Sequence, residues 1–171
     1  GGNPSSGSVG AGTGATVGKI CGMERAMKSG LGMYAVQLGE LRMAAVVAVN
    51  ALGDIFDSST GRKIAGLRTE DGTAFSDSCE ELWKMGQREN LFTGNTTIGA
   101  VITNGKFNKA QMNKIASMTR NAYARCINPV GTMADGDSIY AASAGEVEAD
   151  LNVAGTLAAY VMERAIVAAI R

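Results

Sequence analysis

The sequence predicts a layered α/β sandwich with largely antiparallel sheets. Three features favour this fold class: an apolar hairpin pattern early in the chain, a strand pattern in its middle, and two long amphipathic helices after that. Strands that are close in sequence tend to pair antiparallel, and amphipathic helices bury their apolar stripes against a sheet or against each other. With 171 residues, 46% of them hydrophobic, the chain is long enough for a single domain spanning 1–171.

The first part of the chain is expected to contain a loop followed by a β-hairpin. Residues 1–18 are rich in glycine and serine, and residues 19–28 have space for one turn of helix. The segments 31–38 and 42–50 are rich in strand-forming residues, with Gly39-Glu40 as the turn between them. Because the second segment is apolar throughout, we expect its strand to be central and covered on both faces.

The middle of the chain alternates connections with short elements. The stretch 55–66 carries turn residues, with weak pairing at 64–67, and the polar stretch 87–95 is expected to be an exposed connection. Between them, 76–86 is predicted to form a short helix, because Ser76 or Asp77 can accept a hydrogen bond from its first turn. The apolar pattern of 97–103 predicts a strand.

The second half of the chain is predicted to be mainly helical. A helix begins at Asn108, where Gln111 completes a capping box, and its apolar stripe runs to Cys126, which we expect to be a small core side chain. Pro129 stops this helix. A further strand and a last long helix follow, at 138–144 and 150–171. Charged residues inside the last helix argue against a membrane span.

The composition excludes several classes of partner. Sixteen basic and sixteen acidic residues give a net charge of zero, so neither nucleic acid nor an anionic membrane is the expected partner. We find no uninterrupted apolar run of the length that a membrane span needs. The three cysteines are far apart in the sequence, which favours free thiols in a reducing, cytoplasmic compartment.

The chain contains no histidine. A Ser-His-Asp or Cys-His nucleophile system therefore cannot be built from it, and neither can a histidine-ligated metal site. A covalent hydrolase made from this chain needs a lysine, a carboxylate or an α-amine as its general base.

The glycine-rich start of the chain resembles nucleotide-binding loops only weakly. Residues 10–15 match G-x-G-x-x-A, but no strand precedes them and no helix of sufficient length begins inside them. Gly18-Lys19 resembles part of a phosphate-binding loop, yet Ile20 stands where Ser or Thr would hold magnesium. We therefore expect a tight loop and no cofactor.

The Asn95–Thr96 bond has features of a self-cleavage site. Asn95 precedes a hydroxyl residue that opens a buried strand, and Gly94 before it permits backbone strain. A threonine hydroxyl can attack the preceding carbonyl and move the acyl group to oxygen, leaving an ester for water to hydrolyse. The α-amine that is freed, with a pKa near 7.7–8.0, can then act as the base for its own hydroxyl. Such a mechanism needs no histidine.

Asp135-Gly136-Asp137 is first of all a candidate reverse turn before the strand at 138–144. Its spacing alone favours that interpretation. Two carboxylates on such a turn can also orient an amine or balance its charge.

Taken together, several segments resemble the self-cleaving L-aminopeptidase/D-alanyl-esterase-amidase family, which includes β-peptidyl aminopeptidases and nylon-oligomer hydrolases. The segments that carry the resemblance occur in the family's order and span nearly the whole chain: 10–19, 45–54, 94–104, 128–132 and 135–137. The resemblance implies a four-layer αββα sandwich like that of N-terminal-nucleophile hydrolases, and a peptide or small amide as substrate.

The resemblance also implies roles for individual residues. Thr96 matches the nucleophile of the family, freed by cleavage after Asn95. Asn50 matches a residue that contributes to the oxyanion hole, and Lys19 matches a site lysine that assists proton transfer. Asp135 and Asp137 match acidic residues near the nucleophile.

Cleavage at this bond would divide the chain into 1–95, the end of an α-chain, and 96–171, a β-chain. The resemblance implies an oligomer of processed αβ units, and a longer precursor whose N-terminal part supplies strands, pocket walls and a tyrosine near the nucleophile. Gly131-Thr132 stands where relatives often have His-Thr, so local proton transfer is expected to differ here.

Three other function classes remain open from the sequence. An acyltransferase would use the same Thr96 acyl-enzyme with an amine in place of water. A non-catalytic assembly subunit would keep the fold without reacting at Thr96. A nucleotide-binding module is the weakest of the three. Amide hydrolysis is the leading hypothesis.

Overall fold

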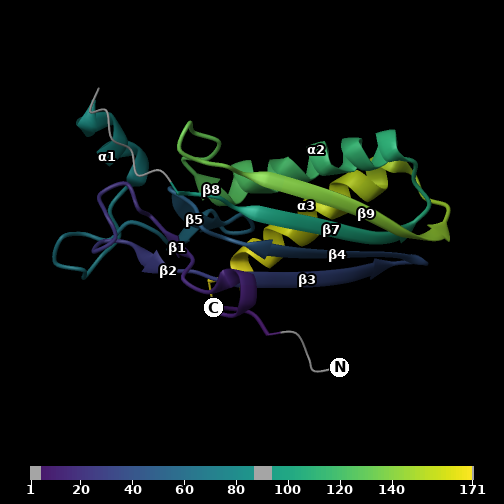
Figure 1. Ribbon diagram of the computed structural model, residues 1–171, viewed down its shortest axis with the longest axis horizontal. Coiled ribbons are helices and arrows are strands. Elements are labelled where there is room, and N and C mark those ends of the chain that lie inside the picture. Colours follow the sequence, from purple (N-terminus) through teal and green to yellow (C-terminus); the bar gives the residue numbers. More distant parts are fainter. Residues whose placement is uncertain (1–4, 87–93, 171) are drawn as a thin grey trace.

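The computed structural model describes residues 5–86 and 94–170. Its main sheet has the strand order β3-β4-β7-β9 (Figure 1). The four strands are β3 (Leu31–Leu38), β4 (Leu41–Ala48), β7 (Ile98–Gly105) and β9 (Ser138–Val147). β3 and β4 form the predicted hairpin, with Leu38 paired to Leu41 across Gly39-Glu40, and both β3–β4 and β4–β7 are antiparallel.

The pairing of β7 with β9 is parallel, which the sequence reading did not anticipate. The helix α2 (Lys109–Cys126) lies between these two strands in the sequence. A helix of this length carries the chain back to the end of the sheet where β7 began, so the next strand runs in the same direction. Asn108 caps α2 by accepting from the Gln111 N–H, and the Gln111 side chain accepts from the Asn108 N–H, which confirms the predicted capping box.

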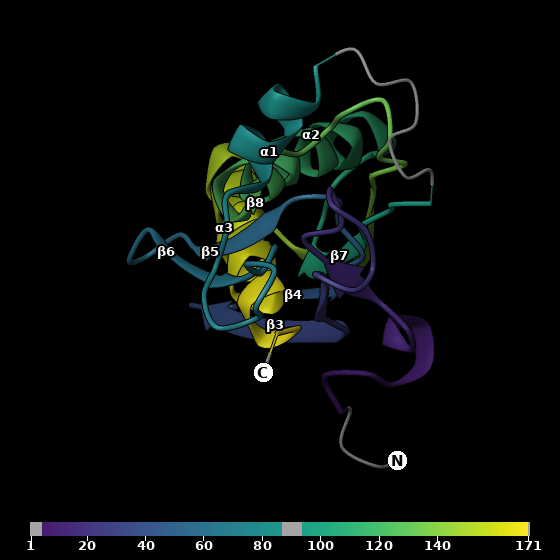
Figure 2. The ribbon, with the colours of Figure 1, turned by 90° about the vertical axis from the view of Figure 1, so that its left-hand side faces the viewer.

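α2 and α3 (Leu151–Ala168) pack together on one face of the main sheet (Figures 1 and 2). Glycines let α3 approach the strands closely: a Cβ on Gly32 of β3 would lie 1.9 Å from the Ala165 carbonyl oxygen. Cys126 is fully buried in this layer, as predicted. By length and composition alone α3 is apolar enough to cross a membrane, and 50% of it is buried inside the fold, as a core helix would be.

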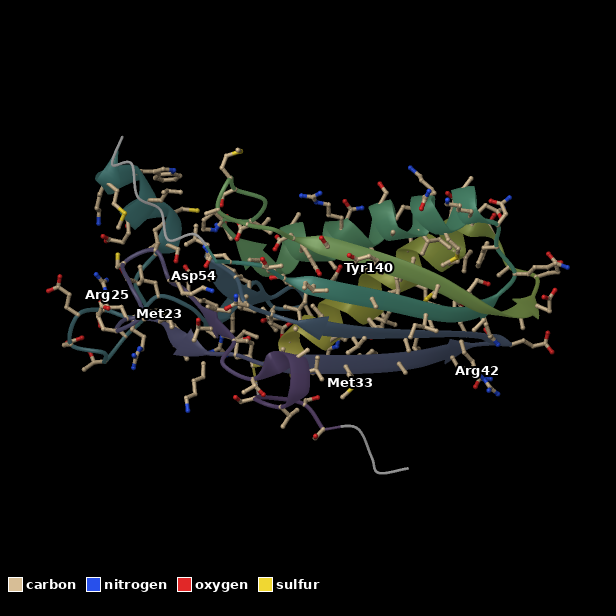
Figure 3. The ribbon with its side chains drawn as sticks, viewed as in Figure 1. Met23, Arg25, Met33, Arg42, Asp54 and Tyr140 are labelled. Atoms are coloured by element: carbon tan, nitrogen blue, oxygen red, sulfur yellow. The ribbon has the colours of Figure 1, made fainter. Side chains whose placement is uncertain are left out.

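No described α-helix or sheet packs on the opposite face of the main sheet, and only the glycine-rich loop approaches it. In β4, Met43, Ala45 and Val47 are buried against the helices, whereas Ala44 and Val46 between them are only half-buried. The prediction that this strand is covered on both faces is therefore wrong for the described residues, although its central position is confirmed. We call the uncovered side the open sheet face; Met33 and Tyr140 mark it in Figure 3, and its members include Met33, Ala44, Val46, Ile98, Ile102 and Tyr140.

The remaining elements lie together at one end of the sheet (Figure 1). They are the 3-10 turn η1 (Gly10–Gly12), β1 (Thr16–Val17), β2 (Met27–Lys28), β5 (Asp54–Asp57), β6 (Arg62–Ala65), α1 (Ser78–Met85) and β8 (Ile127–Asn128). β1 pairs with β2, and the other three strands form a sheet in the order β6-β5-β8. Asp77 caps α1 by accepting from Glu80, one of the two caps that were expected.

The helical turn expected within 19–28 is absent; the segment forms turns that lead into β2. Gly18 and Gly22 flank its first residues with positive φ values of 69° and 97°, a conformation that a right-handed helix cannot include. The predicted weak pairing at 64–67 corresponds to β6, two residues earlier. Residues 87–93 of the predicted connection lie outside the described residues.

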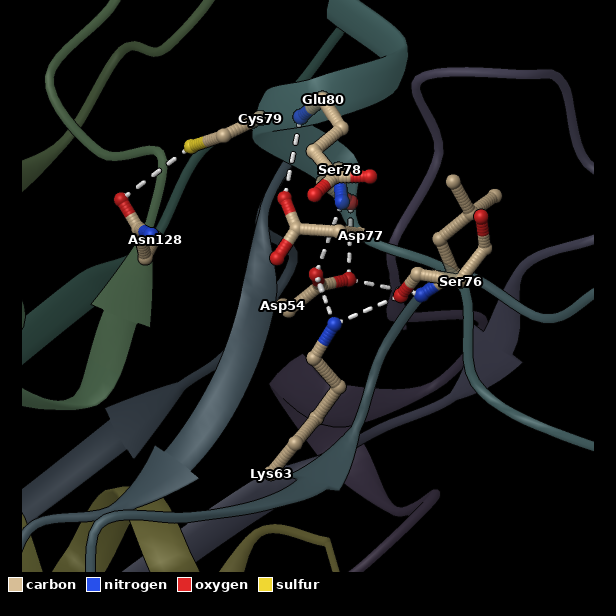
Figure 4. Close-up of polar contacts among 9 residues, drawn as sticks. Asp54, Lys63, Ser76, Asp77, Ser78, Cys79, Glu80 and Asn128 are labelled. Atoms are coloured by element: carbon tan, nitrogen blue, oxygen red, sulfur yellow. Dashed lines mark hydrogen bonds and ion pairs between the residues drawn. The ribbon is translucent and has the colours of Figure 1, made fainter.

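A buried carboxylate joins the elements at this end of the molecule (Figure 4). Asp54, only 1% exposed, accepts at Oδ1 from the Leu67 N–H and the Ser78 hydroxyl, both at 2.7 Å. Its Oδ2 accepts from the Ser78 N–H at 3.0 Å and pairs with the Lys63 ammonium at 2.7 Å. One side chain thus fixes the start of β5, the end of β6 and the start of α1.

Asp54→Ala is expected to lower the free energy of unfolding by about 3–5 kcal/mol, because it leaves the Lys63 ammonium and two backbone N–H groups without their buried acceptor. Urea denaturation measures the change. Asp71→Ala is the matched control, since Asp71 accepts from Thr69 and Thr73 in an exposed turn and its loss should change the free energy of unfolding far less. Equal losses in the two variants would contradict an anchoring role for Asp54.

Candidate active site

Thr96 lies just before β7, with its hydroxyl against the peptide bond that precedes it. Thr96 Oγ1 donates to the Asn95 carbonyl oxygen at 2.6 Å, and the Thr96 N–H donates to the Asn50 carbonyl oxygen at 2.9 Å. The hydroxyl therefore faces the carbonyl that self-cleavage requires it to attack. The half-buried position of Thr96 leaves this side chain accessible from the open sheet face.

Asn95 is held in place by the strand that leads into β9. It is 1% exposed and forms a parallel bridge with Asp135, and its carbonyl oxygen accepts from the Gly136 N–H at 2.9 Å. The Asn95 carbonyl oxygen thus receives hydrogen bonds both from the Thr96 hydroxyl and from a backbone amide across the sheet.

Asn50 follows β4 and connects three parts of the site. Its Oδ1 accepts from the Lys19 ammonium at 2.7 Å and from the Thr16 N–H at 3.2 Å. Its Nδ2 donates to the Gly94 carbonyl oxygen at 3.0 Å. The amide that the sequence predicts in an oxyanion hole is therefore bound to the carbonyl of Gly94, one residue before the Asn95–Thr96 bond.

Lys19 is a buried amine near Thr96, 2% exposed. Its Nζ lies 2.7 Å from Asn50 Oδ1 and 3.2 Å from the Asn50 carbonyl oxygen, which is also the acceptor of the Thr96 N–H. Burial lowers the pKa of Lys19 to about 8, against the opposing effect of the Asp135 carboxylate. An amine with this pKa is neutral in an appreciable fraction near neutral pH, as a general base must be.

The backbone geometry that directs Lys19 inward depends on Gly18. The Gly18 N–H donates to the Gly53 carbonyl oxygen, and the Lys19 N–H donates to that of Leu52, both at 2.9 Å. A Cβ on Gly18 would lie 2.0 Å from the Leu67 nitrogen. The glycine-rich segment thus serves close packing of backbone on backbone, and in its described part, residues 5–18, the only helix is the three-residue turn η1.

The two acidic residues occupy different positions. Asp135 Oδ2 accepts from the Thr132 N–H and hydroxyl, at 3.0 and 2.8 Å, which stabilises the predicted turn. Asp137 Oδ1 accepts from the Thr97 N–H at 2.8 Å, one residue after Thr96. Burial, and secondarily the charge of Asp135, raise the pKa of Asp137, although the Thr97 N–H opposes the shift.

A cavity of about 460 Å³ adjoins Thr96 on the open sheet face. Its lining is mainly apolar and includes several alanines and glycines, and its polar members include Asn50 and the Thr96 hydroxyl. Residues that line it come from the glycine-rich loop, β4, β7 and β9, among them Thr13, Gly14, Val46, Ile98 and Tyr140. Within 5–86 and 94–170, no group of three or more His, Cys, Asp or Glu side chains is placed to hold a metal ion.

The structure brings Lys19, Asn50, Asn95, Thr96 and the 135–137 segment together, and comparison with known proteins assigns the chain to a family. The family model described as Peptidase family S58 matches residues 2–171. The chain belongs to peptidase family S58. This is the family that the sequence segments resembled.

Curated relatives of this S58 chain include two kinds of protein. It is 32% identical over 145 residues to an uncharacterised aminopeptidase of Mycobacterium leprae, which covers 84% of the chain and 38% of that protein. It is 30% identical over 149 residues to a 6-aminohexanoate-oligomer endohydrolase of a Kocuria species, covering 83% of the chain and 40% of that protein. The S58 chain thus spans about two fifths of the length of these relatives.

Solved structures identify the fold of the S58 chain. The L-aminopeptidase D-Ala-esterase/amidase of Ochrobactrum anthropi, described as a variant of the Ntn-hydrolase fold, matches 98% of the chain with a TM-score of 0.62 at 19% identity. A β-aminopeptidase of a Burkholderia species matches the same share with a TM-score of 0.59 at 18% identity. The match covers 45% and 47% of those chains, and it confirms the predicted fold class.

Sequence reasoning missed Gly136 as a member of the site. It was read only as the middle of a turn between two acids. The signal that would reveal it is the register of the sheet. Asn95 lies opposite Asp135, and Ile98 lies opposite Ser138, with the same separation in residue number. That register becomes visible only when β9 is known to run parallel to β7.

Proposed function

We propose that this chain is the catalytic part of a self-processing amide hydrolase of aminopeptidase type, with Thr96 as its nucleophile. The observation that carries the proposal is the 2.6 Å contact between Thr96 Oγ1 and the carbonyl oxygen of Asn95, beside a buried lysine whose pKa is lowered to about 8. Nucleophile, base and backbone donors lie within one connected set of hydrogen bonds.

Self-cleavage proceeds in two steps under this proposal. Thr96 Oγ1 attacks the Asn95 carbonyl carbon as its proton passes to neutral Lys19, and the C–N bond then breaks as the Thr96 nitrogen takes up a proton. Lys19 Nζ and the Thr96 nitrogen both donate to the Asn50 carbonyl oxygen, so the base lies next to the leaving amine. Water hydrolyses the resulting ester, which frees the Asn95 carboxylate and restores the Thr96 hydroxyl.

Turnover of a substrate uses the same groups. The Thr96 α-amine, kept partly neutral by the nearby Lys19 charge, accepts the proton of its own hydroxyl as that hydroxyl attacks the substrate carbonyl. Asn50 Nδ2, released from Gly94 once the chain before Thr96 moves away, becomes available as an oxyanion donor. The α-ammonium gives this proton to the leaving amine as the substrate C–N bond breaks, and water then hydrolyses the acyl-enzyme to release the acid and restore the Thr96 hydroxyl. If an added amine accepted the acyl group in place of water, the product would be a new amide, which product analysis would detect.

The open sheet face supports a further part of the proposal. Ile98, Ile102 and Tyr140 are 51%, 47% and 66% exposed there, an apolar surface of the kind that marks an interaction site. We propose that the N-terminal part of a longer precursor covers it and completes the substrate pocket, and that processed αβ units assemble into an oligomer in the cytoplasm.

The purified full-length protein tests the proposal directly. N-terminal sequencing is expected to find a terminus that begins Thr-Thr-Ile, and denaturing mass spectrometry is expected to find two fragments that meet at Asn95–Thr96. An intact chain that also fails to hydrolyse amides, with the fold preserved, would instead support a non-catalytic assembly role.

A further inference from the structure

Two N–H groups contact neighbouring carbonyl oxygens at the Asn95–Thr96 junction: the Gly136 N–H contacts that of Asn95, and the Asn50 side-chain amide contacts that of Gly94. We propose that the Gly136 N–H is the donor that stabilises the oxyanion on Asn95 during self-cleavage, while the Asn50 amide serves only later, on substrate. This inference rests on the proposed function and names a catalytic group for its first step.

The position of the donor is the first argument. The Gly136 nitrogen lies 2.9 Å from the carbonyl oxygen of Asn95, which becomes the oxyanion when Thr96 attacks. The Asn50 Nδ2 donates to the preceding carbonyl, that of Gly94, at 3.0 Å. The group that already contacts the reacting oxygen is therefore a backbone amide and not the asparagine side chain.

The rigidity of the donor is the second argument. In the β7–β9 ladder from Ile98–Ser138 to Thr103–Ser143, paired residues are separated by the same number of positions as Asn95 and Asp135. The pairing therefore extends in register to residues before the first residue of β7. The next amide along, Ser138 N–H, donates to the Thr97 carbonyl oxygen at 3.0 Å in the same pattern. A donor fixed by a sheet needs no reorganisation as charge develops, which is the condition for strong oxyanion stabilisation.

The requirement for glycine at 136 is the third argument. Gly136 is not among the glycines with positive φ, so its backbone conformation is open to other residues. A Cβ at this position would lie 2.9 Å from Thr96 Oγ1, however. The absence of a side chain therefore serves the nucleophile, because it lets the hydroxyl and the donor approach the same carbonyl.

The change in charge during the reaction is the fourth argument. Before attack, Asn95 O accepts from the Thr96 hydroxyl and from Gly136 N–H. The hydroxyl loses its proton as it attacks, so that hydrogen bond disappears when negative charge forms. The Gly136 hydrogen bond persists and becomes charge-assisted, which roughly doubles its strength. The adjacent carboxylates of Asp135 and Asp137 oppose an oxyanion, and each is engaged by its own donors.

Replacing the Gly136 amide by an ester tests the proposal without adding a side chain. Cell-free translation of the full-length chain can introduce glycolic acid at position 136, which exchanges the N–H for an oxygen. The rate of conversion from intact to cleaved chain, followed by denaturing mass spectrometry, is expected to fall about 10²–10³-fold, as for the loss of one oxyanion donor.

The matched control places the hydroxy acid counterpart of serine, glyceric acid, at position 138. This removes a backbone hydrogen bond of the same ladder, Ser138 N–H to Thr97 O, that does not touch the scissile carbonyl. We expect cleavage within about tenfold of the unmodified rate, because the hydrogen bond lost there contributes to strand pairing alone. Both rates are measured at a temperature where circular dichroism shows the two ester proteins to be folded.

The outcomes are distinct. Slower cleavage in the 136 ester alone supports the proposal. Equal slowing in both esters, or no slowing at position 136, overturns it while leaving self-processing intact. If the unmodified full-length protein does not cleave at Asn95–Thr96 at all, the proposed function fails first, and the inference that rests on it falls with it.

Discussion

Thr96→Ala is expected to abolish both the proposed self-cleavage and amide hydrolysis. Alanine has no hydroxyl to attack the Asn95 carbonyl, which Thr96 Oγ1 contacts at 2.6 Å, so neither the chain nor a substrate can be acylated onto this position. The 171-residue chain is expected to remain a single species at 17.6 kDa in denaturing mass spectrometry. Hydrolysis of amide substrates should fall to background.

Two further variants sharpen this result. Thr96→Ser keeps the hydroxyl and is expected to cleave at the same bond, because serine performs the same chemistry. Thr156→Ala removes a threonine hydroxyl on the exposed side of α3, where it hydrogen-bonds only to its own helix, and should cleave as the unmodified protein does. Cleavage of the Thr96→Ala protein between Asn95 and residue 96 would exclude Thr96 as the nucleophile.

Self-cleavage is expected to accelerate with rising pH until pH passes about 8, the lowered pKa of Lys19. Only the neutral amine can accept the hydroxyl proton, so the rate falls about tenfold for each pH unit below that value. Lys19→Met should slow cleavage about 10²–10⁴-fold and remove this dependence on pH. Rates measured from pH 6 to pH 10 by quenched time points show both effects.

The control for this pH profile is Lys106→Met. Lys106 is an exposed lysine paired with Glu146 and Glu148, whose carboxylates raise its pKa, and it lies far from Thr96 at the other end of β7. Its loss should leave both the rate and the pH profile unchanged. A profile that keeps its rise near pH 8 in the Lys19→Met protein would show that another group is the base.

The lowered pKa of Lys19 also predicts how the stability of the uncleaved chain depends on pH. Because the pKa of Lys19 is about 8 in the folded protein and near 10.5 when exposed, the unfolded state binds more protons between these values. The free energy of unfolding therefore rises with pH across this window. The effect is measured on Thr96→Ala, which stays uncleaved, and the Thr96→Ala/Lys19→Met double variant should lack it.

Elements with strong local signals could be predicted from the sequence. The capping box at Asn108 and Gln111 fixed the start of α2, and the apolar pattern around Gly39-Glu40 gave the hairpin of β3 and β4. The strands β1, β2 and β8 could not be predicted, because two-residue strands have no periodicity to detect, and β5 is only four residues long. The parallel direction of β9 depends on the crossover through α2, which is a property of the whole fold.

The candidate site shows the same division. Thr96, Asn50 and Lys19 could be named because a hydroxyl, an amide and an amine have recognisable chemistry and match a family pattern. Gly136 could not, since its contribution is a backbone N–H and an empty space beside Thr96 Oγ1. Nor could the sequence reveal that the Asn50 donor lies on Gly94, because that contact joins residues 44 positions apart.

The parallel bridge between Asn95 and Asp135 affects when the proposed self-cleavage can take place. The Asn95–Thr96 bond is synthesised before Gly136, whose N–H contacts the Asn95 carbonyl oxygen and which follows Asn95 by some 40 residues. A nascent chain that ends before this point lacks the contact, and a chain in which β9 has not docked lacks it as well. Under the proposed mechanism, cleavage would therefore occur only after β9 has been synthesised and has paired with β7. A chain that has not folded this far would not yet have a free Thr96 amine.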